Sequence, residues 1–405
     1  MGAVSAFPLS RTVALSRTVA GLALGALVLS GCGSSLDEST GSGTEEDRSG
    51  GNVKIGLLVP LSGVYAPLGE DMKAGFELYL DQHDGKLGGR KVDLVTADEG
   101  ESPQTGVPAA QKLVTQDQVT AVAGVVNSAT ALGLRDFFDE SKKPLLVANA
   151  GADDITGARK SEYVWRTSFS NGGVSGALGQ AVADEVKGGV YLIAADYAAG
   201  KEMVAGFRKT FEAAGGKVAG EKYTPFGKTQ DFQPYLSAIR KSGADAVYAF
   251  YAGAEAVNFV KQYKQFGLAD KTALYGTGFL TEGGALAAQG KAAIGVKTSL
   301  HYSTELDTPV NKEFAAAYRA EAGKAPTVYA VQGYDTAAVL DKALAEASGD
   351  SGDALVKALG KVGSIDSPRG AWKFDADHNP EQTYYLREVR ADGDTAVNAV
   401  LGELG

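Results

Sequence analysis

The feature that most limits how this chain can fold is a regular alternation of short apolar runs with segments of helical periodicity, which begins at Val53. Short apolar runs are typical of buried strands, and apolar residues three and four positions apart are typical of helices that cover a sheet. A β-α-β order of this kind predicts a parallel sheet with helices on both faces. In the first part of the chain we expect strands at Val53–Val59, Val92–Ala97, Ala121–Val125 and Pro144–Ala148, and helices at Gly69–Gln82, Pro108–Gln116 and Ala129–Glu140.

The same alternation restarts after Arg166 and Thr167. It therefore predicts an α/β protein with two doubly wound, Rossmann-like lobes, between which the chain crosses more than once. Because ligands of such sheets bind beyond the carboxyl ends of the strands, the cleft between the lobes is the expected site. In this part we expect strands at Gly189–Ala194, Ala244–Tyr251, Thr272–Tyr275 and Gly295–His301, helices at Gly200–Ala214, Ala254–Phe266, Val310–Ala322 and Val328–Ala347, and a hairpin-like pair of strands at Trp372–Phe374 and Tyr384–Val389.

The segment 1–31 has the pattern of an export signal: Arg11 and Arg17 precede a short apolar run, and no acid occurs. The run is interrupted by glycines and is shorter than the roughly 20 apolar residues of a membrane span. Its ending, Leu29-Ser30-Gly31-Cys32, resembles a bacterial lipobox, in which the cysteine is acylated and becomes the new amino terminus. We therefore expect a signal peptide at 1–31, lipid on Cys32 and a flexible linker through residue 52. An ordinary secretory signal with a chance cysteine is the alternative.

The composition excludes several classes of function. The formal net charge is -10 and the Lys and Arg residues are dispersed, whereas nucleic-acid binding needs clustered cations. Cys32 is the one cysteine, so the rest of the chain has no disulfide, thiol nucleophile or thiolate metal site. We expect no metal, no cofactor and no nucleic-acid partner. Roughly 350 of the 405 residues follow the signal and linker, which suits two lobes better than one core.

Catalytic motifs fail when their spacing is checked. Gly227-Lys228-Thr229 resembles the end of a phosphate-binding loop, but Lys222 stands where the first glycine belongs. Asp375 to Asn379 resembles the start of a calcium loop, but Pro380 replaces the required glycine. Neither a His-Glu-x-x-His motif nor a Gly-x-Ser-x-Gly motif occurs. We therefore expect that the protein is not an enzyme.

Polar and small residues follow three of the expected strands of the first lobe. They lie in the segments Pro60–Tyr65, Gly124–Ser128 and Ala148–Gly151, each of which leads towards a helix whose first N–H groups attract a carboxylate. Tyr197 and Tyr251 end strands of the second lobe and could close over an apolar ligand. Helix capping by the polar residues and ordinary packing of the tyrosines are the alternatives. The candidate ligand-binding residues are Tyr65, Asn127, Ser128, Asn149, Ala150, Gly151, Tyr197, Tyr251 and Gly278.

Several short motifs, in this order, resemble the type I periplasmic-binding-protein family, and specifically the leucine-binding branch that serves ABC importers of branched-chain amino acids. The likeness extends from Val53 to about Val389. The motifs are Pro60-Leu61-Ser62-Gly63, Gly267-Leu268, Val328 to Ala337, and Ser367-Pro368-Arg369-Gly370.

The resemblance implies two lobes joined by three crossings, near Arg166-Thr167, Thr298–Tyr302 and Ile365–Ala371. The first lobe would comprise 53–167 and 303–364, and the second 168–302 and 365–405. It also implies a small-molecule ligand, ABC permease subunits as partners, and ligand contacts from Ser128 or Asn127, Ala150, Tyr197 and the strand end near Tyr251.

One departure from the leucine-binding pattern bears on the ligand. Relatives carry an acid after a strand of the second lobe to hold the α-ammonium, whereas this chain has Gly278 there, with Glu255 and Glu282 as possible substitutes. We expect an exported, lipid-anchored receptor for a small carboxylate, either a hydrophobic amino acid or an aromatic acid or amide. A ligand sensor for a signalling partner has the same fold. A hydrolase or transferase would need an activated nucleophile that the sequence does not show.

Overall fold

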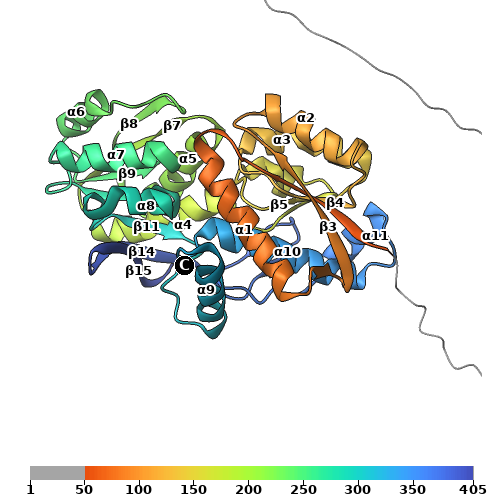
Figure 1. The fold of residues 1–405 in the computed structure, drawn as a ribbon. Helices are drawn as coiled ribbons and strands as arrows, with labels where there is room; N and C mark the ends of the chain where they lie inside the picture. The colour runs from red at the N-terminus through yellow and green to blue at the C-terminus, as the bar shows by residue number, and fades with distance from the viewer. Residues whose placement is uncertain (1–50, 405) are drawn as a thin grey trace, which may run out of the picture. The chain divides into compact units, whose positions relative to one another are not determined.

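The computed structural model describes residues 51–404, and most strands of this part of the chain form two large sheets (Figure 1). The strands of the first are β1 (Val53–Val59), β2 (Lys86–Leu87), β3 (Arg90–Asp98), β4 (Ala121–Gly124), β5 (Leu145–Val147) and β6 (Val164–Arg166). Their order is β2-β3-β1-β4-β5-β6. All neighbours pair in parallel except β2, which is antiparallel to β3. This is the doubly wound sheet that the first alternation predicts.

The second sheet combines parallel strands with an antiparallel edge. Its strands are β7 (Gly189–Asp196), β8 (Lys217–Pro225), β9 (Ala246–Phe250), β10 (Ala273–Thr277), β11 (Lys297–Leu300), β14 (Tyr384–Asp392) and β15 (Thr395–Leu404). The order is β15-β14-β11-β10-β9-β7-β8, with β14 antiparallel to both β11 and β15. A separate small ribbon pairs β12 (Lys373–Phe374) with β13 (Pro380–Glu381).

Helices connect these strands and cover both sheets. The α-helices are α1 (Ala66–Gln82), α2 (Pro103–Thr115), α3 (Ser128–Ser141), α4 (Asn171–Glu185), α5 (Ala198–Ala213), α6 (Gln233–Ser242), α7 (Gly253–Gln265), α8 (Gly284–Gln289), α9 (Pro309–Ala322), α10 (Val328–Glu346) and α11 (Gly352–Leu359). The 3-10 turns are η1 (Gly63–Tyr65), η2 (Asp153–Ile155), η3 (Gly157–Arg159), η4 (Gly278–Thr281) and η5 (Gly290–Ala293).

Alternate residues of the central strands supply the cores on opposite faces of each sheet, because successive side chains of a strand point to opposite sides. Leu57 of β1 packs in the core with residues of α1 and α10, and Leu58 packs in another with residues of α2 and α3. Figure 1 shows α1 and α10 side by side, apart from α2 and α3. In the second sheet, Leu192 of β7 shares a core with α5, and Ile193 shares one with α7.

The predicted two-lobed α/β fold is confirmed, and the expected strands and helices overlap those observed. Several helices begin earlier than expected, and the largest difference is at α2, which starts at Pro103 rather than at Pro108. Proline is favoured at the first helical position, where its missing N–H has no intrahelical partner to lose. Pro108 lies inside the helix.

The predicted carboxy-terminal hairpin is wrong. Phe374 pairs with Pro380 in the β12–β13 ribbon, whereas the segment from Tyr384 continues as β14 and pairs with β15. The turn between β14 and β15 lies at Gly393, whose φ of +56° suits a glycine in a tight hairpin. The Asp-Gly signal of this turn is present in the sequence, so the correct partner could have been found.

The chain passes between the lobes after β6, after β11 and after α11. A buried arginine of the third connection contacts the first. Arg369 Nε lies 2.8 Å from Asp335 Oδ2 of α10, and its guanidinium donates to the backbone oxygens of Thr167 (2.7 Å) and Ser168 (3.0 Å). Helices α9 and α10 pack against α1 of the first lobe. The residue boundaries of the lobes given above stay a prediction.

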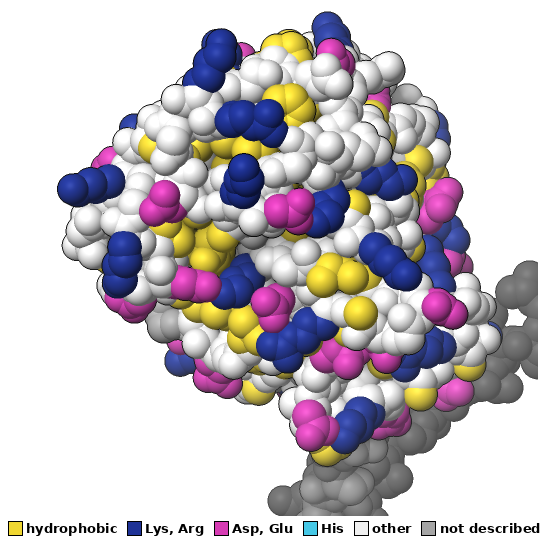
Figure 2. Space-filling view, turned by 90° about the vertical axis from the view of Figure 1, so that its left-hand side faces the viewer, with side chains coloured by type: hydrophobic (Ala, Val, Ile, Leu, Met, Phe, Trp, Pro, Cys, Tyr) yellow, Lys and Arg dark blue, Asp and Glu magenta, His cyan; other side chains and the backbone are white. Residues whose placement is uncertain are grey.

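On the face shown in Figure 2, basic and acidic side chains are interspersed and do not form a patch of one sign. Among residues 51–404, the helices include none with the length and apolarity of a membrane span. The predicted signal peptide, Cys32 and the linker up to residue 50 lie outside the described residues.

Candidate functional site

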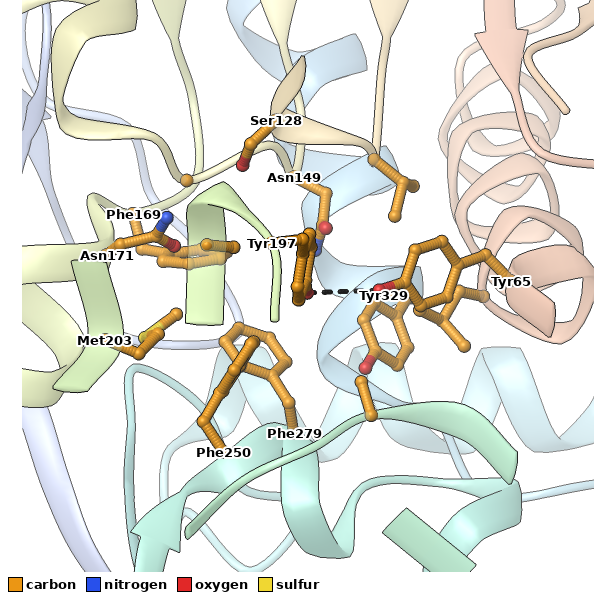
Figure 3. Close-up of a pocket in the computed structure, with 15 residues that line it drawn as sticks. Tyr65, Ser128, Asn149, Phe169, Asn171, Tyr197, Met203, Phe250, Phe279 and Tyr329 are labelled. Carbon is orange, nitrogen blue, oxygen red and sulfur yellow. Dashed lines mark hydrogen bonds between the residues drawn. The ribbon is translucent and has the colours of Figure 1, made fainter. Parts of the chain in front are cut away.

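A cavity lies where the carboxyl ends of strands from both sheets meet, and its lining comes from both lobes (Figure 3). It encloses about 370 Å³ of space free of protein atoms, its open side included. The lining residues are Tyr65, Leu68, Val126, Ser128, Asn149, Gly151, Phe169, Asn171, Tyr197, Ala199, Met203, Phe250, Ala252, Phe279 and Tyr329.

Five helices begin at this cavity. Ser128 and Asn171 are the first residues of α3 and α4, and Ala199, Ala252 and Tyr329 stand at or beside the first residues of α5, α7 and α10. The first N–H groups of a helix lack partners within it and carry the positive end of its dipole. The dipoles of these helices favour an anionic group in the cavity, although side chains already accept several of the first N–H groups and none of the described lining residues is a cation.

Aromatic rings form most of the apolar wall. The ring of Phe279 lies 4.8 Å from that of Phe169, 6.1 Å from that of Tyr329 and 6.4 Å from that of Phe250. Tyr197 stacks at 6.2 Å on Phe250. Figure 3 shows these rings around one space. Such a wall suits a flat ring or a branched aliphatic chain.

The hydroxyls of Tyr65 and Tyr197 lie 3.1 Å apart and form a hydrogen bond between the lobes (Figure 3). Burial raises the pKa of Tyr65 well above its ordinary value, and the neighbouring Tyr197 adds to the effect. Burial raises the pKa of Tyr197 as well. Both phenols are therefore neutral at physiological pH, and one of the two retains a hydrogen that it can donate.

Polar contacts come chiefly from Ser128, Asn149 and Asn171. Ser128 Oγ accepts a hydrogen bond from the N–H of Ala152 at 3.2 Å, so its own hydrogen is free to be donated. The amide nitrogens of Asn149 and Asn171 donate to residues behind the wall.

The buried carboxyl of Glu99 lies behind the loop at Val126 and Asn127 in the first lobe. Both oxygens of Glu99 accept N–H groups, from Val126 at 2.7 Å and from Asn127 at 2.8 Å. Burial nevertheless raises the pKa of Glu99 to about 8. The carboxyl is therefore mostly neutral at pH 7 and becomes charged above pH 8.

No acid lines the described part of the cavity. Glu255 accepts an N–H from Thr229 at 3.4 Å, and Glu282 forms an ion pair with Arg387 at 3.0 Å; neither is a lining residue. A side chain at Gly278 would meet Arg387 at 2.3 Å, so this position has no room for an acid. An α-ammonium would therefore lack the charged partner that a buried charge requires.

Of the candidate residues from the sequence, Tyr65, Ser128, Asn149, Gly151 and Tyr197 are brought together around the cavity. That these residues bind the ligand stays a prediction.

The other four described candidates do not line the cavity. The side chain of Asn127 caps α3 by accepting the N–H groups of Ala129 and Thr130, which is the alternative noted above. Ala150 is buried and its N–H bonds to Val125. Tyr251 packs in the core on the far side of β9 and accepts a hydrogen bond from Thr224. The place of Gly278 in the wall is taken by the next residue, Phe279.

Sequence reasoning missed Phe250, Asn171 and Tyr329 among others. Phe250 and Tyr251 are neighbours at the end of one strand, and the sequence does not say which of the two faces the ligand. Asn171 begins a helix that was not predicted, although Ser170 before it is a typical N-cap.

Comparison with known proteins agrees with the fold. The profile of the periplasmic binding protein family matches residues 52–394, and the chain belongs to that family. It is an extracytoplasmic solute-binding protein of the kind that serves ABC transporters, and it is not an enzyme. The resemblance to type I periplasmic binding proteins of the branched-chain amino-acid branch is thereby confirmed.

Three relatives show how close the similarity is. A Brucella melitensis protein named Leu/Ile/Val-binding protein homolog 6 is 33% identical over 355 residues, which are 85% of this chain and 90% of that protein. An R. palustris ABC-transporter solute-binding protein, solved in complex with benzoate, is 38% identical with a TM-score of 0.81, covering 88% of this chain and 98% of its own. A Rhodopseudomonas palustris BisB5 solute-binding protein, solved with 3,4-dihydroxy benzoic acid, is 30% identical with a TM-score of 0.81, covering 87% and 97%.

Proposed function

We propose that this protein captures a small aromatic carboxylate between its two lobes and delivers it to an ABC permease. The observation that carries the proposal is the pairing of an aromatic wall with helix amino termini in a cavity whose described lining includes neither an acid nor a cation. The helix termini suit one carboxylate, and the rings of Phe250 and Phe279 suit a flat ring. The ligands of the two Rhodopseudomonas relatives are aromatic acids, which supports the same assignment.

A hydrophobic amino acid is the second candidate. The name of the Brucella relative favours it, as does the branch of the family to which the motifs belong. The lining lacks the acid that would hold the α-ammonium, because Glu282 is bound to Arg387 and Glu255 lies behind the wall. Burying an ammonium without a charged partner is costly, so the amino acid should bind less well than its deaminated analogue.

Titration calorimetry on the purified protein tests the proposal. The ligands are benzoate, leucine, phenylalanine and 3-phenylpropanoate, which is phenylalanine without its ammonium. We expect benzoate and 3-phenylpropanoate to bind and the two amino acids to bind far more weakly. Tighter binding of leucine or phenylalanine would show that an acid serves the site after all, and would restore the amino-acid assignment.

Delivery to a permease, rather than signalling to a membrane receptor, is also part of the proposal. Uptake of radiolabelled benzoate by cells that carry or lack the gene distinguishes the two. Loss of uptake supports transport, whereas unchanged uptake with a lost transcriptional or chemotactic response supports a sensor.

A further inference from the structure

Two amide side chains of the cavity have their NH₂ groups engaged from behind. Asn149 Nδ2 donates to Gln332 Oε1 at 2.7 Å, and Asn171 Nδ2 donates to Glu202 Oε2 at 2.8 Å. An amide side chain has one acceptor oxygen and one NH₂ group. In each case one of the two N–H donors is used behind the wall, whereas no described residue donates to the amide oxygen, which is an unused hydrogen-bond acceptor.

The orientation of Asn171 follows from its partner. Glu202 Oε2 acts as an acceptor here and so receives the NH₂ group of the amide, although burial raises the pKa of this carboxyl. The same oxygen of Glu202 also accepts the N–H of Asp153 at 3.1 Å. On the other side, a Cβ added at Gly151 would lie 2.1 Å from Asn171 Oδ1. The amide oxygen thus occupies the space that a side chain at this cavity-lining glycine would take.

The orientation of the Asn149 amide depends on a second buried pair, Gln332 and His301. Gln332 uses its oxygen to accept from Asn149, and its nitrogen lies 3.2 Å from His301 Nε2. With Gln332 in this orientation the imidazole accepts at Nε2 and carries its proton on Nδ1, which is buried without a partner among the described residues. It is neutral, because burial, reinforced by two buried arginines, lowers the pKa of His301 well below its ordinary value. Donation therefore runs in one direction, from Asn149 at the cavity through Gln332 to His301.

We propose that Gln332 and Glu202 are positioning residues that fix Asn149 and Asn171 as acceptors, so that the cavity selects aromatic acids bearing a ring hydroxyl over unsubstituted benzoate. This inference rests on the proposed function and narrows its ligand class. A ring hydroxyl donates to an amide oxygen, whereas a bare ring edge leaves that oxygen desolvated and without a partner. The serine and tyrosine hydroxyls of the cavity can turn to suit either ligand, but the two amides cannot.

Calorimetry with a matched ligand series tests the inference on the unaltered protein. The probes are benzoate, the three monohydroxybenzoates and the corresponding methoxybenzoates, which have no donor. We expect at least one hydroxybenzoate to bind roughly 3- to 10-fold more tightly than benzoate, which is the effect of one net hydrogen bond. Its methoxy counterpart should lose the gain.

Variants then test the positioning residues. Gln332→Met and Glu202→Met remove the acceptors behind the amides, and each should bring the hydroxybenzoate-to-benzoate ratio towards one. Glu202→Gln should keep most of the preference, because its amide oxygen can still accept from Asn171. Gln289 is the matched control: it is a buried glutamine that donates to Ala256 and Leu280, away from the cavity. Gln289→Met should leave the ratio unchanged.

The outcomes separate this inference from the proposed function. If benzoate binds as tightly as every hydroxybenzoate, or if the Met variants keep the full preference, the inference is overturned and the aromatic-acid assignment stands. If none of the aromatic acids binds, the proposed function itself fails. If phenylalanine binds more tightly than all of them, the two oxygens serve an ammonium, and both proposals fall.

Discussion

The buried ion pair at the connections between the lobes yields the sharpest test of what holds this fold together. Arg369 and Asp335 have side chains that are 1% and 0% exposed, and they lie 2.8 Å apart. Asp335 also accepts from Ser367 at 2.9 Å and from Trp372 at 3.1 Å, while Arg369 donates to Thr167 and Ser168. Removing one partner of such a pair leaves the other as a buried charge, which costs about 3–5 kcal/mol.

We therefore expect Arg369→Met to lower the free energy of unfolding by about 3–5 kcal/mol, because Asp335 keeps its charge and loses its cation. Asp335→Asn should lose about as much. The double variant should lose less than the sum of the two, because it leaves no uncompensated charge. Urea unfolding, followed by fluorescence and circular dichroism together, measures each value and checks that the transition is two-state.

The control lies on the neighbouring ribbon. Lys373 and Glu381 form an ion pair at 2.9 Å, but their side chains are 63% and 54% exposed. Lys373→Met should cost less than about 1 kcal/mol, since water already solvates both charges. If Arg369→Met costs no more than Lys373→Met, the ion pair does not hold the connections together and the reasoning is wrong.

Three further predictions concern pH, anchoring and motion. Because the pKa of Glu99 rises from about 4.5 in the unfolded chain to about 8 in the fold, the folded state holds the extra proton between these values. The free energy of unfolding should therefore fall as pH rises from 5 to 8. Urea unfolding at the two pH values should show a smaller difference for Glu99→Gln than for the unaltered protein. An equal difference would show that Glu99 is ionised throughout. Cys32→Ser should release the protein from washed membranes, because lipid is the expected anchor; a variant that stays bound would refute lipidation. Saturating ligand should reduce the radius of gyration measured by solution scattering, since a ligand that binds only the closed form shifts the lobes towards it; an unchanged radius would count against closure.

Much of the fold could be predicted because apolar residues recur at regular spacing over long segments of the sequence. The run Val53–Val59 is β1 without a residue gained or lost, and the helical pattern from Val328 ends one residue beyond α10. Helix α4 was missed because it is rich in glycine and alanine, although its large apolar residues Val174, Leu178 and Val182 are four positions apart and lie on one buried face. It forms nonetheless because Ser170 caps its start and because it packs closely against α5. Tertiary packing therefore stabilises helix α4, and the intrinsic helix propensity of its residues does not.

The residues of the candidate site were likewise predicted only in part. Strand-end loops with small and polar residues identified Ser128, Asn149 and Gly151, because backbone geometry makes such residues necessary there. The aromatic wall was predicted only in part: Tyr65 and Tyr197 were candidates from the sequence, whereas Phe250 was not. At the end of β9 one of Phe250 and Tyr251 faces the cavity and the other the core, and only the three-dimensional packing decides which.

One helix carries both the wall of the cavity and the contacts that set the lobes. On α10, Tyr329 lines the cavity, Gln332 holds Asn149, and Thr336 forms a 2.7 Å hydrogen bond with Thr167 at the first connection. These residues are three and four positions apart and share one face of the helix. Because these residues share one helix, we expect a shift of the first connection on closure to move the cavity wall and the partner of Asn149 together. Closure should then complete the geometry presented to the ligand, so that the receptor binds tightly when closed and releases its ligand when open.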